Sequence, residues 1–217
     1  NMGSAMISGM LKKGLYKKDD LLSMVMAEAT NHYFKHLGVS DGLSQVCIPS
    51  IYQDELGAVW LGTTEGLNRY NGKDVKVFQP SESNHGLTNN EINELCGDKN
   101  GRMYIRSGND LIKLDIYTEQ FTCLRQKGVY GLFCKKDTLW VSCADGIYYY
   151  TGQGTELTFF ARVQKGFVGR ALYVDKETVW VVTRKYLVAI SREDPLRQEI
   201  LLTLDKGNCI LGDSSGN

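Results

Sequence analysis

The chain has 217 residues, enough for one large domain or two small ones, and it carries 25 basic and 25 acidic side chains. A formal net charge of zero without a basic stripe argues against nucleic acid as a partner, because phosphate binding needs clustered Lys and Arg. The hydrophobic fraction of 42% excludes a disordered chain, and no apolar run reaches the roughly 18–20 residues of a membrane span, so we expect no membrane contact.

Residues 1–31 differ from the rest and are expected to form a separate N-terminal tail. The first six, NMGSAM, look like a cloning remnant. Four lysines precede the short apolar run 21–27, and Ala27-Glu28-Ala29 fits a signal-peptide cleavage site. The alternative is a short amphipathic helix that begins at Asp19 or Asp20. The tail is therefore either a tag or signal-like remnant or a helix.

Residues 48–78 read as four short strands joined by turns. Strands are expected at 48–52, 59–63, 67–70 and 75–78, with turns around Gly57, Gly66 and Asn71-Gly72. Four antiparallel strands in about 40 residues make up one blade of a β-propeller.

This unit recurs along the chain. Residues 51–70 and 95–114 align without gaps, and their shared Asp, Gly and aromatic positions are Asp54 and Asp98, Gly57 and Gly101, Trp60 and Tyr104. Two shorter copies, at 139–150 and 179–190, keep mainly Trp140 and Trp180. A β-sandwich does not explain the recurring Asp-x-x-Gly-x-x-aromatic register. We therefore predict an all-β propeller over residues 32–217, with four-stranded blades at 46–79, 91–124, 129–161 and 167–204 and a fifth blade beginning at 208.

Residues 54–70 closely resemble the two-component regulator propeller repeat, and residues 33–44 resemble the usual entry into its first blade. The resemblance covers residues 33–217, although Arg106 stands where the first repeat has Gly62. It implies the periplasmic sensor region of a Bacteroides-type hybrid two-component histidine kinase. Such sensors detect glycans and control polysaccharide-utilisation genes, and their kinase would lie outside this chain.

Sensors of that family usually carry two seven-bladed propellers, so the resemblance implies that this chain is a fragment of a larger propeller. The strand expected at 33–37 would normally complete the closing blade. The expected partners are the remaining blades and a second sensor copy. Compact closure of four blades is the alternative.

A ligand face is expected where the loops between second and third strands meet the loops between blades. Sugars are held by planar hydrogen-bonding groups and aromatic faces, and acidic sugars add an Arg or Lys contact. The candidate ligand-binding residues are Arg106, Asn109, Asp110, Asn90, Arg184, Lys185 and Tyr186. The alternative is a rim that is merely solvated. Trp60, Trp140 and Trp180 are expected in the core rather than as sugar platforms, because their place in the repeat is fixed.

The six cysteines (Cys47, Cys96, Cys123, Cys134, Cys143 and Cys209) include no CxxC spacing, and none of the three histidines lies near a cysteine pair. We expect no metal site and no cofactor. Three disulfides in an oxidising compartment and six buried thiols remain equal alternatives.

The sequence contains no serine nucleophile elbow, no P-loop and no His–acid pair at a fixed strand position, so we expect no catalytic residues and no enzyme activity. The leading hypothesis is a periplasmic, oligosaccharide-sensing propeller segment of a hybrid two-component sensor. The alternatives are a structural or dimerisation segment of the same sensor and, less favoured, a propeller lyase.

Overall fold

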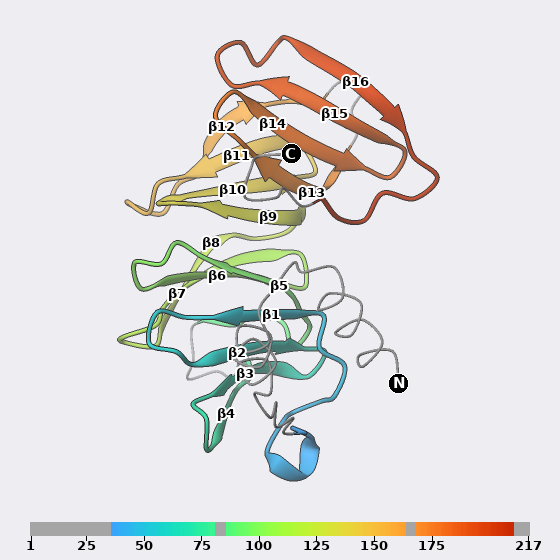
Figure 1. Ribbon diagram of the computed structural model, residues 1–217. Helices are drawn as coiled ribbons and strands as arrows, with labels where there is room; N and C mark the ends of the chain where they lie inside the picture. Colours follow the sequence, from blue (N-terminus) through green and yellow to red (C-terminus); the bar gives the residue numbers. More distant parts are fainter. Residues whose placement is uncertain (1–35, 81–85, 164–167, 211–217) are drawn as a thin grey trace, which may run out of the picture. The chain divides into compact units, whose positions relative to one another are not determined.

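The computed structural model describes residues 36–80, 86–163 and 168–210 (Figure 1). Over these residues the chain forms one short 3-10 helix, η1 (Val39–Asp41), and sixteen strands in four four-stranded antiparallel sheets. Each sheet is built from four consecutive strands that pair in chain order. The predicted all-β architecture of four-stranded antiparallel blades is confirmed. The tail at 1–31, the start of the strand expected at 33, and residues 211–217 of the fifth blade lie outside the described residues.

The strand bounds of the first two sheets are as follows. Sheet one contains β1 (Ser50–Gln53), β2 (Val59–Thr63), β3 (Gly66–Tyr70) and β4 (Val75–Phe78). Sheet two contains β5 (Ile92–Gly97), β6 (Arg102–Ser107), β7 (Asp110–Asp115) and β8 (Gln120–Arg125).

The other two sheets repeat the pattern. Sheet three contains β9 (Val129–Lys135), β10 (Thr138–Cys143), β11 (Gly146–Tyr150) and β12 (Thr158–Ala161). Sheet four contains β13 (Gly169–Val174), β14 (Thr178–Thr183), β15 (Tyr186–Ser191) and β16 (Gln198–Thr203).

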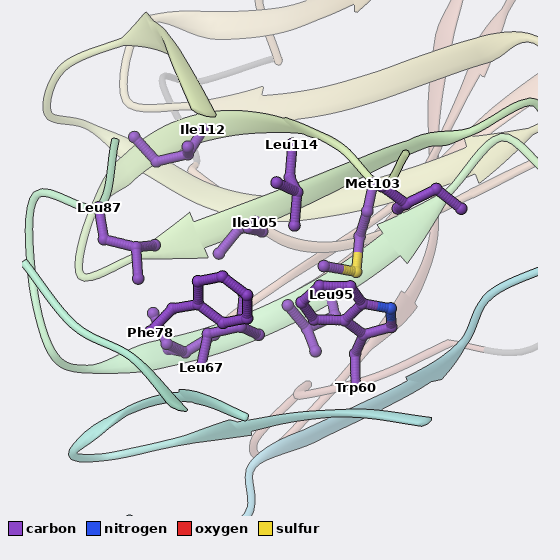
Figure 2. Packing of buried hydrophobic residues seen from close by; sticks show 11 residues of the cluster. Trp60, Leu67, Phe78, Leu87, Leu95, Met103, Ile105, Ile112 and Leu114 are labelled. Atoms are coloured by element: carbon purple, nitrogen blue, oxygen red, sulfur yellow. The ribbon is translucent and has the colours of Figure 1, made fainter. Parts of the chain in front are cut away.

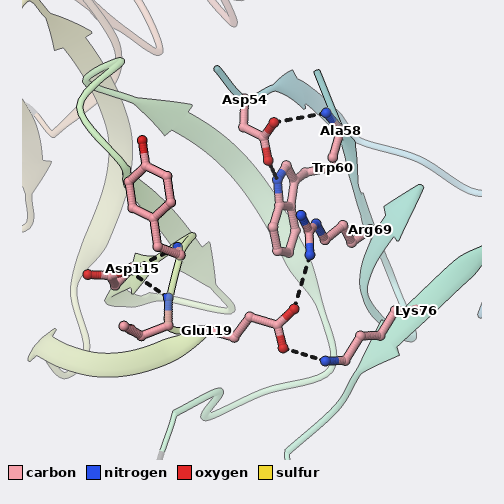
Figure 3. A network of polar contacts seen from close by, with 9 residues as sticks. Asp54, Ala58, Trp60, Arg69, Lys76, Asp115 and Glu119 are labelled. Carbon is pink, nitrogen blue, oxygen red and sulfur yellow. Dashed lines mark hydrogen bonds and ion pairs between the residues drawn. The ribbon is translucent and has the colours of Figure 1, made fainter. Parts of the chain in front are cut away.

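The recurring aspartate closes the turn between the first and second strands. In sheet one, Asp54 Oδ1 accepts a hydrogen bond from the backbone N–H of Leu56. The same oxygen accepts one from the N–H of Ala58, and Oδ2 accepts one from Trp60 Nε1 at 2.8 Å (Figure 3). These bonds satisfy a carboxylate that is only 4% exposed. Asp54 therefore acts structurally, by fixing both the turn and the tryptophan ring.

The same device appears in sheet four, at a position that the repeat alignment missed. Asp175 Oδ1 accepts hydrogen bonds from the N–H groups of Glu177 and Thr178, and its Oδ2 accepts one from Trp180 Nε1 at 2.7 Å. The aspartate precedes the tryptophan by five residues here and by six in sheet one, so an ungapped alignment does not bring the two together.

The core lies between neighbouring sheets rather than within one sheet. Trp60, Leu67 and Phe78 of sheet one pack against apolar residues of sheet two, among them Met103 and Ile105 (Figure 2). Equivalent apolar clusters join sheets two and three around Tyr104, and sheets three and four around Trp140. Three interfaces of this kind hold the four sheets together, and sheets two and three each have an apolar face on both sides.

Sheet four has a face that the described residues cover only in part, because the segment around Gly207 packs on Val182 while Leu202 stays exposed. Leu202 pairs with Leu187 as Phe78 pairs with Leu67, so each pair lies at the same place in its sheet. Phe78 is 7% exposed, whereas Leu202 is 56% exposed. Trp180 is also only partly buried, so the prediction of core packing holds for Trp60 and Trp140 but not fully for Trp180.

The first strand of each sheet contacts the first strand of the next, in the order β1, β5, β9 and β13. This is the arrangement of the innermost strands of a propeller. Polar side chains on these strands therefore converge, although the strands are far apart in sequence.

Candidate functional site

A cavity of about 610 Å³ opens where the four innermost strands converge. We call it the inner-strand cavity. Each sheet contributes to its wall, and the segment after β16 completes it. Its lining consists of Pro49, Ser50, Asn93, Glu94, Leu95, Arg106, Leu132, Phe133, Arg170, Ala171, Leu172, Tyr173, Asn208, Cys209 and Ile210. The volume is within the range of small-molecule sites.

Arg106 is the one predicted ligand-binding residue that lines this cavity. It lies on β6 rather than in the hairpin loop where the sequence placed it, and it pairs with Glu94 on β5. Its Nε lies 3.3 Å from Oε2 of Glu94, and its Nη1 donates to the carbonyl oxygen of Gly108 at 3.3 Å. The guanidinium is therefore oriented by its own sheet.

Glu94 also connects sheet two to sheet three. Its Oε2 accepts a hydrogen bond from the backbone N–H of Leu132 on β9 at 3.1 Å. Burial raises the pKa of the Glu94 carboxyl, while the Arg106 charge and the Leu132 N–H act in the opposite direction. The net effect is a raised pKa, so Glu94 takes up a proton more readily than an exposed glutamate.

Arg170, on β13, supplies a second guanidinium to the lining. It is exposed, and its guanidinium makes no hydrogen bond or ion pair with another described residue. Asn93, Tyr173 and Asn208 add two amide groups and a phenol ring. The charged lining side chains are two arginines and one glutamate, so the cavity carries an excess of positive charge.

The hairpin between β6 and β7 is held mainly by neighbouring loops. Asp110 Oδ1 accepts a hydrogen bond from the N–H of Lys127 at 2.6 Å, and the carbonyl oxygen of Asn109 accepts one from Val129 at 3.0 Å. Asn90 is exposed in the loop before β5. None of the three predicted residues in this region, Asn90, Asn109 and Asp110, lines the inner-strand cavity.

The hairpin between β14 and β15 carries the last three predicted residues. The carbonyl oxygens of Arg184 and Lys185 accept hydrogen bonds from Gly207 and Leu204, at 3.4 and 2.6 Å, while both side chains are exposed. The N–H of Tyr186 donates to Thr183 Oγ1 at 2.9 Å, and its ring packs on the cluster between sheets three and four. These residues do not line the inner-strand cavity either.

Four cavity residues escaped the sequence analysis: Asn93, Glu94, Arg170 and Asn208. The first three lie on the first strand of a sheet, whereas the sequence analysis expected ligand-binding residues in the rim loops. A usable signal was present, because Asn93-Glu94 and Arg170 interrupt strands that are otherwise largely apolar. To tell which polar residues of an innermost strand face the propeller axis, however, one must know the register of the blade.

The described residues contain no cluster of three or more His, Cys, Asp or Glu side chains suited to a metal ion. In the same part of the chain we find no helix that is both long and apolar enough to cross a bilayer.

Comparison with known proteins relates one repeat to a described family. Residues 42–65 match the family model described as two component regulator propeller. This stretch is a two component regulator propeller repeat. The resemblance predicted from the sequence is confirmed for that segment. The chain is also 40% identical over 53 residues to histidine kinase P4 of Formosa agariphila, which corresponds to 24% of this chain and 4% of that protein.

Two solved structures share the fold. The extracellular domain of a hybrid two component system from B. thetaiotaomicron has a TM-score of 0.71 and 23% identity, covering 84% of this chain and 28% of that one. A second such domain from the same organism has a TM-score of 0.65 and 21% identity, over 84% and 26% of the two chains. The chain thus spans about a quarter of the length of these relatives, and its fold is that of their propellers.

Proposed function

We propose that this chain is part of the periplasmic sensory region of a hybrid two-component system, and that its inner-strand cavity binds an acidic oligosaccharide. The first part is supported by the propeller repeat at residues 42–65 and by the fold shared with extracellular domains of such systems. The kinase activity would belong to other domains of the parent protein, and this segment would bind without catalysis.

The observation that carries the ligand proposal is the guanidinium of Arg170, which has no hydrogen-bond or ion-pair partner among the described residues and lines the same cavity as the Arg106–Glu94 pair. Guanidinium groups recognise carboxylates and sulfates through paired hydrogen bonds, which suits uronate or sulfated sugars. Asn93 and Asn208 supply amide donors and acceptors for sugar hydroxyls, and Tyr173 adds an aromatic surface. A neutral sugar would leave the excess positive charge of the lining without a partner.

Binding in this cavity would act on the arrangement of the sheets. Every sheet contributes lining residues, so a ligand that contacts several of them favours one relative placement of the blades. The signal is then a shift in population between arrangements of the sensor, passed toward the kinase and on to polysaccharide-utilisation genes.

The test is calorimetric titration with uronate-containing and sulfated oligosaccharides, each beside a neutral oligosaccharide of equal length. We expect saturable heat only with an acidic ligand. Arg170→Gln and Arg106→Gln should each lower the affinity for this ligand at least tenfold, because each removes a charge-assisted contact of about 1.5–3 kcal/mol. Arg184→Gln is the matched control, since it removes the same charge from an exposed hairpin outside the cavity. An equal loss of affinity in Arg184→Gln would show that the ligand binds at the rim instead.

A second candidate, a structural role, is favoured by one specific observation. The face of sheet four that contains Trp180, Leu187 and Leu202 has the pattern that is buried between the other sheets, yet Leu202 is 56% exposed. We propose that this sheet-four face packs against a further four-stranded blade of the same sensor, or against the equivalent face of a second sensor copy. The two functions are compatible, because this face and the inner-strand cavity share none of these three residues.

A further inference from the structure

Two of the six cysteines lie against each other across the interface between sheets two and three. The Sγ atom of Cys96, on β5, is 2.7 Å from the Sγ atom of Cys134, on β9. Both side chains are partly buried and pack on the cluster around Tyr104. A disulfide bond is about 2.05 Å long, so these thiols need only a small movement to join.

The strand register explains why the two thiols meet. Cys96 pairs with Tyr104, and residues that pair across antiparallel strands share a face, so Cys96 is on the face of sheet two that packs against sheet three. Cys134 pairs with Leu139, which belongs to the same interface. The contact is therefore built into the register of two strands and does not depend on a flexible loop.

A second link between the same strands lies beside the cysteines. Glu94 precedes Cys96 by two residues, and Leu132 precedes Cys134 by two residues. Glu94 Oε2 accepts the hydrogen bond from the Leu132 N–H at 3.1 Å. The contacts of Glu94 with Leu132 and of Cys96 with Cys134 thus form two successive connections between β5 and β9, and both strands line the inner-strand cavity.

From this geometry we infer that Cys96 and Cys134 form a disulfide that fastens sheet two to sheet three when the protein folds in an oxidising compartment. The oxidant is a disulfide of the thiol–disulfide exchange class, either a protein disulfide or oxidised glutathione. One cysteine thiolate attacks this disulfide, forms a mixed disulfide and displaces one thiolate. The second cysteine thiolate then attacks the Sγ atom of the first cysteine, forms the Cys96–Cys134 bond and displaces the remaining thiolate of the oxidant. The two electrons and two protons end on the two thiols of the reduced oxidant.

The surroundings of the pair decide when it reacts. Burial strongly raises the pKa of the Cys96 thiol, with contributions from neighbouring Cys134 and from Glu94 and Asp98, so little thiolate exists once sheets two and three have packed. The bond therefore forms while the two sheets are assembling. Once formed, it is protected from reduction by the same burial.

The other cysteines serve as internal controls. Cys47 and Cys209 are exposed, Cys143 is buried, and Cys123 packs in the cluster between sheets one and two. Among the described residues, no other cysteine pair has its sulfur atoms in contact. Non-specific oxidation would act first on the exposed cysteines Cys47 and Cys209. The variant Cys47→Ser/Cys209→Ser prevents disulfides that involve either of them.

The experiment is peptide mapping of this variant after refolding in a glutathione redox buffer, with free thiols alkylated in denaturant. Trypsin is expected to place Cys96 in residues 77–99 and Cys134 in residues 128–135, separate from Cys123 and Cys143. We expect these two peptides to be joined in most molecules, with the intact mass lower by the two hydrogen atoms lost. Full alkylation of both Cys96 and Cys134 at oxidising glutathione ratios would overturn the inference, and so would joining to Cys123 or Cys143.

Thermal unfolding gives an independent readout. Refolding under reducing conditions, which leaves both thiols free, should lower the melting temperature by roughly 5–10 °C relative to the oxidised protein, because the bond closes a long loop of the unfolded chain. Cys96→Ser and Cys134→Ser should each abolish this response, whereas Cys123→Ser should retain it. A response that persists in Cys134→Ser would contradict the pairing. Neither readout involves a ligand, so the result stands apart from the sugar-binding proposal.

Discussion

Arg106 and Glu94 form an ion pair within sheet two that also reaches sheet three. The Nε of Arg106 lies 3.3 Å from Glu94 Oε2, and the same oxygen accepts the Leu132 N–H at 3.1 Å. One carboxylate oxygen therefore orients a guanidinium in the inner-strand cavity and fastens β5 to β9. The arginine that interrupts the sequence repeat at the position of Gly62 is thus part of an interface and of a cavity wall at once.

This relationship predicts that the stability losses from removing Arg106 and from removing Glu94 are not additive. Arg106→Leu leaves a partly buried carboxylate without its ion pair and should lower the free energy of unfolding by about 1–3 kcal/mol. In the double variant Arg106→Leu/Glu94→Leu the loss should be smaller than the sum of the two single losses. Urea unfolding of the four proteins measures the coupling. Strict additivity would mean that the pair contributes no coupling energy.

Ligand binding in the inner-strand cavity should depend on the charge of Glu94. Because burial raises the pKa of Glu94, this carboxyl becomes neutral at a pH above the range of an exposed glutamate. As the pH falls through that raised pKa, Arg106 loses its internal partner and becomes more available to an anionic sugar. The association constant for an acidic oligosaccharide should therefore rise as the pH falls from neutral through the raised pKa of Glu94. In Glu94→Gln the constant should be higher at pH 7 and nearly flat; an unchanged slope would contradict this role.

The hydrogen bonds of Asp175 predict that part of the folding stability is lost as the pH falls. Burial opposes its charge, but hydrogen bonds from Trp180 Nε1 and from two backbone N–H groups lower its pKa below the usual range. A depressed folded-state pKa stabilises the fold above the unfolded pKa of about 3.9, and the contribution disappears as the pH falls through the folded value. Asp175→Asn should therefore destabilise the protein at pH 7, and the loss should shrink as the pH falls through the lowered pKa of Asp175. A loss that stays equal as the pH falls would show that the charge of Asp175 is unimportant.

The sheet-four face predicts self-association or docking that depends on Trp180 and Leu202. Leu202→Ser should change the free energy of unfolding by no more than about 0.5 kcal/mol, because surface substitutions rarely do more. Phe78→Ser, at the equivalent but buried position in sheet one, should cost about 3–5 kcal/mol. Sedimentation velocity of the Leu202→Ser variant should show weaker concentration-dependent association than the unaltered chain. Unchanged sedimentation at every concentration would remove the second-copy form of the structural proposal.

The fold could be predicted because its signal is repeated. Trp60 and Tyr104 recur with their aspartates and glycines at the same spacing, and every blade needs a large residue there to fill the gap to the next sheet. Asp175 escaped recognition because its turn is one residue shorter, which breaks an ungapped register while leaving the hydrogen bond to Trp180 intact.

The site was predicted less well, and the reason is geometric. Loops were expected to hold the ligand, but Arg184 and Asn109 belong to hairpins held by backbone hydrogen bonds to neighbouring segments. The cavity is built instead from single polar residues on first strands, such as Glu94 and Arg170. Sequence spacing identifies the strands, but it does not show that residues about forty positions apart point toward one axis. Arg106 was found for a different reason, because it breaks the repeat.

The most direct test of the central claim is hydrogen exchange of the protein with and without a saturating acidic oligosaccharide from the titration panel. Binding in the inner-strand cavity predicts slower exchange at residues 93–95 of β5 and 170–173 of β13, and no change in the hairpin at 183–186. At a ligand concentration close to the Kd of the unaltered protein, the protection should be much weaker in Arg170→Gln than in the unaltered protein. Slower exchange confined to the hairpins at 107–110 and 183–186, with the first strands unchanged, would contradict the account and place the ligand on the rim.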